Sequence, residues 1–342
     1  MAKSPISTPA CRHPDEFGLL AAVLANPADD LPKLVYADWL DERADPRGQF
    51  VRQWLGWRKT GGKLPKPPTG VVKAWLGLIG YDLDRALAGL DEMPKWAGKI
   101  RGAVKPCLDV KTKRAKADKD IPVGVSKVGG CPDLPAGTDW PTNDDHPIAF
   151  LAQWNLAELA GSPAASPLPR SGLLSFFVDL QPYIDDEYDD DPPGLVLYTP
   201  DTGGLTRLKM PKDLPKECRL KPCRVTFTER GTVLGIDTVA LKQARVMREE
   251  DQEAYAEFFS DVLEDGVVPI KGPHQILGNY QPIQEDPVQF KKEKDWLLLS
   301  QFNRDTACGL EVGDGGAFYF FIRREHLVAA RFDRVFMELQ MG

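Results

Sequence analysis

The sequence predicts an α+β protein, built mostly from antiparallel sheets with an internal duplication and preceded by a small N-terminal three-helix module. Near the N-terminus, apolar residues recur at helical spacing. From residue 121 onward the pattern changes to short strands, Pro-rich turns and aromatic residues, and two sequence blocks recur in the same order. Because helical and strand segments are segregated along the chain, we expect an α+β fold rather than a parallel α/β fold.

Changes in residue pattern also predict the domain boundaries. The chain has 342 residues, of which 42% are hydrophobic, a size that fits about two domains. The predicted segments are a flexible tail (1–13), a helical module (14–58), a linker rich in Gly and Pro (59–70), and an α+β domain (71–342) that begins with a helical lead-in (71–100).

Three short helices are predicted in the helical module. The first covers residues 17–25, the second residues 30–43, and the third places Phe50, Trp54 and Trp57 on one face. The first helix is an apolar run that could be read as a secretory signal, but Asp15 and Glu16 stand where a signal carries positive charge. The sequence therefore predicts a cytoplasmic protein.

The larger domain is predicted to be mainly strands. Apolar residues over 72–90 recur at helical spacing, with Gly77 and Gly80 as weak points, and a second amphipathic helix covers 255–263. The basic stretch 99–120 lacks interleaved aromatic residues, so it is predicted to be a solvated strand edge or loop rather than a nucleic-acid patch. Strands are predicted at 148–154, 172–178, 194–198, 224–228, 296–302 and 316–322.

Two blocks of sequence predict the duplication. Residues 151–155 read Leu-Ala-Gln-Trp-Asn, and residues 299–303 read Leu-Ser-Gln-Phe-Asn. Each is followed, after a similar interval, by a glycine and an aromatic strand, at 172–178 and 316–322. The repetition predicts two equivalent strand units that share one core.

The duplicated glutamines, Gln153 and Gln301, are the most informative polar residues. Each lies on a strand that is apolar on both faces, so each buried amide needs hydrogen-bond partners. Two interpretations remain open. The amides could bond neighbouring backbone and fix the strand register, with the turn at 313–316 as a partner for Gln301, or they could line a cleft between the halves together with Asp314 and His274.

Other candidate chemistry is weak. The six cysteines form no Cys-x-x-Cys pair, and Cys218 and Cys223 are not followed by a second pair of ligands. We therefore expect no metal site and no cofactor, although a nucleophilic Cys131 beside His146 or His274 stays open. The acidic run 185–191 is predicted to be a solvated loop, and Gly313–Gly316 a β-hairpin turn.

Two family resemblances add to this interpretation. Residues 15–52 resemble the bacterial repeat-companion domain, a helical module often found beside repeat arrays, although this chain lacks such an array. That family has no established activity. The match rests on Leu19–Pro27, Leu34–Arg43 and Asp45–Arg52.

Residues from about 104 to 341 resemble the YwqG family of uncharacterised bacterial proteins. The resemblance implies an α+β fold but no reaction, cofactor or catalytic residue, and some family members are thought to protect cells from toxins by binding them. One departure is Glu311-Val312, where the family usually has a Met-Trp-like pair. The matching stretches are Ser126–Pro135, Asp139–Pro141, Phe150–Gln153, Asn155–Leu159, Leu168–Pro169, Gly172–Phe177, His274–Gly278, Leu297–Gln301, Gly313–Gly316 and Phe332–Val335.

These observations predict three classes of function, of which the third is a purely structural adaptor joined through the helical module. The first is a non-catalytic, immunity-like module that binds another protein, with the net charge of −7 attracting a basic partner. The alternative is a small-molecule binder or enzyme with a cleft between the duplicated halves. The acidic balance argues against nucleic-acid binding. The chain also has no run of 18 apolar residues that would predict a membrane-spanning helix. Oligomeric state cannot be predicted from the sequence.

Overall fold

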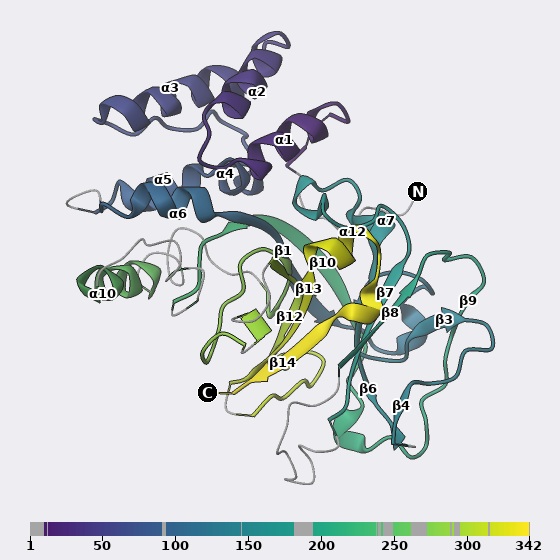
Figure 1. The fold of residues 1–342 in the computed structure, drawn as a ribbon. Helices are drawn as coiled ribbons and strands as arrows, with labels where there is room; N and C mark the ends of the chain where they lie inside the picture. Colours follow the sequence, from purple (N-terminus) through teal and green to yellow (C-terminus); the bar gives the residue numbers. More distant parts are fainter. Residues whose placement is uncertain are drawn as a thin grey trace.

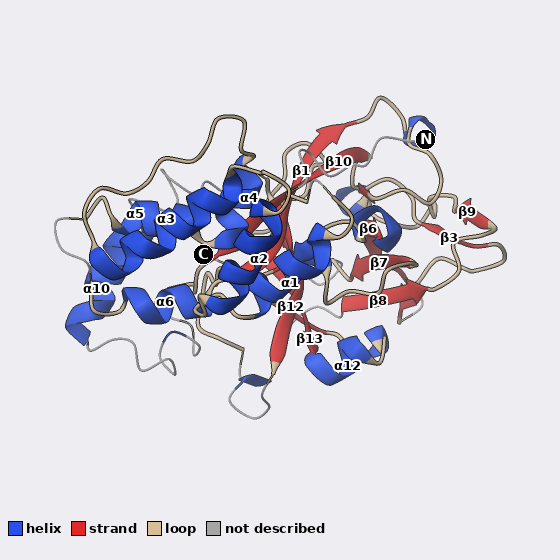
Figure 2. Cartoon of the chain, turned by 90° about the horizontal axis from the view of Figure 1, so that it is seen from above, coloured by secondary structure: helices blue, strands red, loops and turns tan. Residues whose placement is uncertain are grey.

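The structure, a computed structural model, places a group of helices against one large curved sheet (Figure 1). It describes residues 10–341 except 12, 91–93, 145, 181–193, 237, 239–240, 242–248, 261–271, 288, 291–294 and 314. Mixed helices and strands, with an antiparallel sheet, agree with the predicted α+β class. Seen from above, helices α1–α6 gather on one side of the molecule and the strands lie beside and beneath them (Figure 2).

The N-terminal helices match the three predicted ones. They are α1 (Glu16–Ala25), α2 (Leu31–Asp41) and α3 (Arg47–Thr60), and their buried side chains include Leu20, Tyr36 and Trp54. This core continues into the lead-in helix α4 (Lys73–Ile79) through Trp75, and from there into the sheet. The helical module (14–58) therefore packs on the rest of the protein.

The predicted helix over 72–90 is divided by glycine. Helix α4 ends at Gly80, whose φ of 91° lies in the left-handed region that favours glycine, and α5 (Tyr81–Leu87) begins directly after it. A second apolar cluster joins α5 to α6 (Ala97–Ala103) and α10 (Glu249–Phe258), in which Trp96 contacts Tyr255 and Phe258 edge-on. The remainder of the predicted helix 255–263, from residue 261, lies outside the described residues.

The main sheet has ten strands in antiparallel pairs and is nearly closed into a barrel. Its spatial order is β8-β7-β6-β2-β10-β1-β11-β12-β13-β14. The two edge strands approach each other, so a Cβ atom added to Gly194 on β8 would lie 2.5 Å from Met337 Cβ on β14. The strands are β1 (Lys105–Arg114), β2 (Lys127–Val128), β6 (Ala149–Asn155), β7 (Leu173–Val178), β8 (Gly194–Thr199), β10 (Cys223–Thr232), β11 (His274–Leu277), β12 (Trp296–Asn303), β13 (Ala317–Arg323) and β14 (Phe336–Gln340).

Short elements cover and connect these strands. Strand β3 (Asp133–Pro135) pairs with β9 (Leu205–Arg207), and β4 (Thr142–Asn143) pairs with β5 (His146–Pro147). The short helices are α7 (Leu156–Leu159), α12 (Arg324–Val328), η1 (Asp118–Asp120), η2 (Pro163–Ala165), η3 (Lys216–Cys218) and η5 (Phe332–Arg334).

The sheet has two matched sides. Pairing of β6 with β7 is interrupted by a bulge at Leu151, and pairing of β12 with β13 is interrupted by a bulge at Leu299. Gln153 and Gln301 each follow two residues later, opposite Lys127 on β2 and Gln275 on β11 respectively. The first half-sheet (β2, β6, β7 and β8) and the second half-sheet (β11, β12, β13 and β14) thus place related sequence at related positions.

Aromatic side chains fill the space between the half-sheets. Trp154 of the first stacks on Phe302 of the second, with ring centroids 5.8 Å apart and an interplanar angle of 12°. Phe176 meets Phe302 and Phe320 edge-on at 5.4 and 5.2 Å. The predicted shared core is therefore present, and it is packed with side chains.

Two local predictions were wrong. The basic stretch 99–120 contains β1, which lies between β10 and β11 in the middle of the sheet. The strand residues Cys107–Val110 are buried, whereas Lys111 and Lys113 further along the strand are exposed. The turn at Gly313–Gly316 does not join a hairpin, because β13 pairs with β12 and β14 and residues 310–312 form no strand.

Candidate functional site

Gln153 lies in a buried polar network on the outer face of the first half-sheet. Its Oε1 accepts a hydrogen bond from the backbone N–H of Asp133 at 2.9 Å, and its Nε2 donates to the Val125 carbonyl and to Asp133 Oδ2 at 2.8 and 2.7 Å. Arg207 Nε donates to the same carboxylate at 2.8 Å. The Gln153 amide therefore links three segments of chain, and all of its contacts are with protein groups.

Burial and neighbouring charges shift the pKa of two ionisable groups near Gln153. Burial lowers the pKa of Lys127, whose ammonium donates to Asp118 at 3.0 Å. Burial alone would raise the pKa of Asp133, but hydrogen bonds from Arg207, Gly124 and Gln153 and the charge of Lys127 outweigh it and lower that pKa. Both groups are thus held in place by compensating charge.

Gln301 belongs to a different network on the second half-sheet. Its Oε1 accepts from the backbone N–H of Gln281 at 3.3 Å, and its Nε2 donates to Asn303 Oδ1 at 2.8 Å. These partners replace the turn at 313–316 that the sequence suggested. Neighbouring Gln275 accepts from Arg230, which also forms a two-pronged ion pair with Asp109.

The four residues of the predicted cleft are not gathered into one cluster by the described contacts. Gln153 and Gln301 have separate partners, and Asp314 lies outside the described residues. His274, on β11, is buried with its ring 5.4 Å from that of Phe302 in the core. Of the predicted set, His274 is therefore the residue whose side chain packs in the aromatic core.

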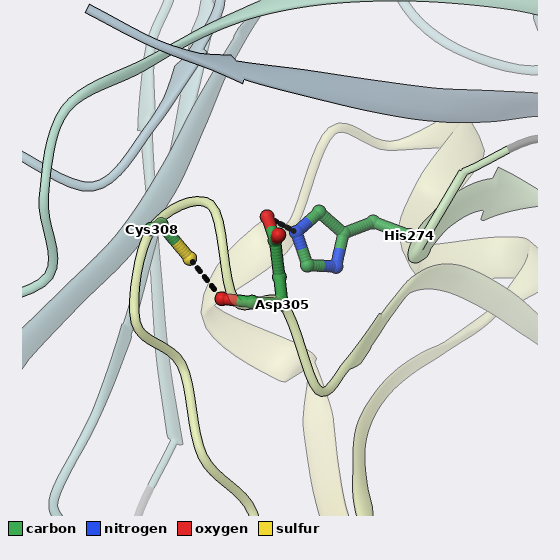
Figure 3. A group of neighbouring side chains, drawn as sticks. All are labelled: His274, Asp305 and Cys308. Carbon is green, nitrogen blue, oxygen red and sulfur yellow. Dashed lines mark hydrogen bonds and ion pairs between the residues drawn. The ribbon is translucent and has the colours of Figure 1, made fainter.

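Two residues that sequence reasoning did not select accompany His274. Asp305 and Cys308 follow β12, and Figure 3 shows both pointing toward the space beside the imidazole. One ligand atom from each of His274, Asp305 and Cys308 lies within 4.8 Å of the other two, and all three residues are buried. We refer to these three residues as the His-Asp-Cys cluster.

Polar bonding in this cluster is incomplete. His274 Nε2 lies 3.3 Å from Asp305 Oδ2, but neither atom makes a hydrogen bond of normal geometry, and His274 Nδ1 has no hydrogen-bond partner. The Cys308 thiol donates to the Asp305 carbonyl at 3.5 Å (Figure 3). An imidazole, a carboxylate and a thiol at these separations can pair with one another or bind a metal ion.

The charge of Asp305 extends through the cluster. Burial alone would raise the pKa of Asp305, but polar contacts with His274 and Thr112 and a hydrogen bond from Ala307 lower it to about 2. Burial, reinforced by the Asp305 carboxylate, raises the pKa of Cys308 and that of Cys223, the latter to about 11. Both thiols are therefore poor nucleophiles in this environment.

The loop that carries Asp305 and Cys308 is tightly built. Asp305 and Leu310 form a two-way backbone bridge, and Asp305 Oδ1 accepts from the Ala307 N–H at 2.8 Å. Gly309 has a φ of 80°, which places a glycine where the chain turns back. The sequence carried no local signal for the cluster, because His274 and the loop with Asp305 and Cys308 are far apart along the chain.

The other cysteine and histidine suggestions find different partners. Cys131 lies beside Asp118, which accepts from its backbone N–H at 2.7 Å, while His146 contacts Asp179 at 2.9 Å. The described contacts therefore do not join Cys131 to His146 or to His274. Cys218 and Cys223 are both buried and unoxidised.

The chain belongs to a family of unknown function. Residues 126–340 match the family described as a domain of unknown function (DUF1963), to which the YwqG resemblance also points. The match covers β2 through β14 but not β1, the strand that completes the centre of the sheet. No curated protein matches the chain. Within the described part of the structure, no helix is both long and apolar enough to cross a membrane.

Proposed function

We propose that this chain is a non-catalytic module that binds another protein through the outward face of helix α2. The observation that carries the proposal is an apolar stripe on that face. Leu31 and Val35 are 64% and 47% exposed, and Trp39, one turn further along, is partly exposed. Residues at i, i+4 and i+8 lie on one side of a helix, so the three form one surface, here called the α2 stripe.

The opposite face of α2 explains why Leu31 and Val35, unlike Trp39, which packs against the core, are not needed for folding. Tyr36, Ala37 and Leu40 are buried in the core of the helical module. That core therefore stands without Leu31 and Val35, whose exposure favours a role in recognition.

The acidic charge of the helical module and of the whole chain favours a basic binding partner. Residues 14–58 contain eight acidic and five basic side chains, and the whole chain carries a net charge of −7. An excess of acidic over basic side chains in a module with an apolar stripe suits a partner that presents apolar side chains flanked by Lys or Arg. With the YwqG resemblance, a basic protein toxin is the first partner class to test.

The compartment we propose is the cytoplasm. All six cysteines are free, four of them buried, which suits a reducing environment.

A cleft between the halves is the alternative that we do not favour. Gln153 and Gln301 bond to protein groups in separate networks, and the space between the half-sheets holds Trp154, Phe176 and Phe302. Binding through the α2 stripe therefore has more support than catalysis in a cleft between the halves.

The origin of the two half-sheets and of the helical module forms part of the same proposal. The equivalent bulges at Leu151 and Leu299 support a duplication. A repeat-companion identity for residues 15–52 is supported by one buried network, in which Arg47 donates to Glu16 at 2.7 Å and the Tyr36 hydroxyl lies between Glu16 and Trp75. Tyr36 and Arg47 come from the segments that carry the resemblance.

Affinity capture with surface variants tests the binding role. Wild type and a Leu31→Glu/Val35→Glu variant would be used as bait in cells, with Val123→Glu as a matched control, since Val123 is 50% exposed elsewhere. We expect one protein retained by wild type and by Val123→Glu and lost by the double variant, with equal melting temperatures for the three baits. Titration of that protein, purified, should show at least a tenfold loss of affinity for the double variant. Identical captured sets for all three baits would overturn the proposal.

A further inference from the structure

We propose that His274, Asp305 and Cys308 bind a Zn²⁺ ion, as a site with three protein ligands that joins β11 to the loop 305–310 and leaves the fourth coordination position to a water molecule. Imidazole nitrogen, carboxylate oxygen and thiolate sulfur are the three donor types that proteins use for zinc. The proposal is independent of the α2 stripe, which lies on the helical module.

The separations within the His-Asp-Cys cluster suit metal ligands as well as an ion pair. A charge-assisted bond between imidazole and carboxylate is about 2.7–2.9 Å long, whereas His274 Nε2 and Asp305 Oδ2 are 3.3 Å apart. Two ligands at about 2.0–2.1 Å from a tetrahedral zinc ion stand about 3.3–3.4 Å from each other. With all three ligand atoms within 4.8 Å, one ion can contact each donor after small side-chain adjustments.

The buried polar atoms provide a second, independent observation. His274 Nδ1 is buried without a hydrogen-bond partner, and Nε2 and Asp305 Oδ2, which form an ion pair at 3.3 Å, make no hydrogen bond of normal geometry. A buried polar atom without a hydrogen bond costs about 1–3 kcal/mol, so native proteins seldom retain several together. A metal ion between Nε2 and Oδ2 would replace their long contact with two short metal–ligand bonds.

The first half-sheet provides an internal control. Because Lys127 opposes Gln153 as Gln275 opposes Gln301, the position equivalent to His274 is Ser126. There the Ser126 hydroxyl accepts from the Asn155 N–H at 2.8 Å, and Asn155 Oδ1 accepts from Ala157 N–H at 3.0 Å at the start of α7. Beside Ser126, other protein groups supply the hydrogen bonds. Beside His274, at the equivalent position of the second half-sheet, the polar atoms of the His-Asp-Cys cluster face one another.

Binding has a simple proton balance. The Cys308 thiol would lose its proton to solvent as the sulfur–zinc bond forms, while Asp305 binds as the carboxylate and His274 as the neutral imidazole. No oxidation is involved. The Cys308 carbonyl also accepts from the Lys221 N–H at 2.7 Å, so the ion would tie β11 to a loop that already contacts the segment before β10.

Metal content and cobalt spectroscopy of the full-length chain test this site. Protein purified without chelator should contain one zinc per chain, as should Cys107→Ser, a control at a buried cysteine outside the cluster. After zinc removal, Co²⁺ should produce a thiolate-to-cobalt charge-transfer band in wild type and Cys107→Ser. That band should be lost in Cys308→Ser, and His274→Gln should bind Co²⁺ at least tenfold more weakly.

A measurement on the wild type alone guards against variants that fail to fold. Adding Zn²⁺ to the zinc-free protein should raise its melting temperature by a few degrees, and chelator should reverse the rise. The proposal is overturned if wild type contains no zinc and shows neither the cobalt band nor the thermal shift, which would leave an ion pair alone. It is also overturned if Cys308→Ser retains the same band, because another cysteine would then be the ligand.

Discussion

The two half-sheets share a backbone frame but differ in the polar groups that they bury. In the first, Gln153 is surrounded by charge, with Lys127, Asp133 and Arg207 in one network. In the second, Gln301 bonds to a backbone N–H and to Asn303, while the ion pair of Arg230 with Asp109 contacts Gln275, the residue opposite Gln301 on β11. The bulges and the inward aromatic residues thus hold the register, while the outer face can vary.

The ends of the half-sheets differ even more. After Asn155, the first half-sheet continues into α7, with Asn155 as the N-cap. After Asn303, the second continues into the loop that brings Asp305 and Cys308 to His274. The same position in the two half-sheets therefore carries a helix start in one and the loop of the His-Asp-Cys cluster in the other.

The largest expected effect tests whether the halves contribute equally to the core. Trp154→Ala and Phe302→Ala should each lower the free energy of unfolding by about 3–5 kcal/mol, because each removes a buried ring from the same stack. The double variant should cost less than the sum, since the two rings are in contact. Urea denaturation measures all three; a small cost for one ring would show that the halves are unequal.

Acid sensitivity should distinguish the first half-sheet. Its Asp133 has a lowered pKa in the folded protein, so its contribution to stability is present above the unfolded pKa of about 4 and is lost as the pH falls through the lower folded value. Asp133→Asn should cost about 3 kcal/mol at pH 7 and reduce the loss of stability below pH 4. Unfolding free energies measured from pH 7 to pH 3, with exposed Asp201→Asn as control, check this. An unchanged acid slope would contradict it.

Substituting the two glutamines compares the networks directly. Gln153→Leu should destabilise by about 2–3 kcal/mol, because it leaves the backbone N–H of Asp133 and the carbonyl of Val125 without their buried partner. Gln301→Leu should cost about 1 kcal/mol, since its bond to Gln281 is longer, at 3.3 Å. Thermal unfolding beside wild type ranks the pair. Unchanged melting temperatures for both would instead favour a binding role for these amides.

The smallest expected difference concerns the two asparagines. Asn155→Ala removes a helix N-cap and a bond to the Gly124 carbonyl, which should cost about 1–2 kcal/mol. Asn303→Ala removes one acceptor of Gln301 and should cost about 0.5–1 kcal/mol. Chemical denaturation resolves this order, and a reversed order would mean that the loop after β12 depends on Asn303 more than its hydrogen bond to Gln301 indicates.

The spacing of apolar residues along the chain predicted much of the fold, because it indicates which side chains are buried. The strands around Gln153 and Gln301 and the break at Gly80 follow from period and from glycine chemistry. Strand β1 was missed because its composition is dominated by exposed lysines, although Cys107–Val110 supply the buried centre. The His-Asp-Cys cluster was missed because its members come from separate segments and no ligand pair has a familiar spacing.

The sequence by itself determined the α+β class, the helices of the module, the strands of the two repeated blocks and the burial of both glutamines. These properties depend on neighbours along the chain, through side-chain period, backbone freedom and turn chemistry. Only the tertiary structure decided that Gln153 and Gln301 bond in separate networks, that Trp154 stacks on Phe302, and that His274 meets Asp305 and Cys308. Those contacts depend on strand order and sheet curvature, which bring distant residues together and leave no local trace in the sequence.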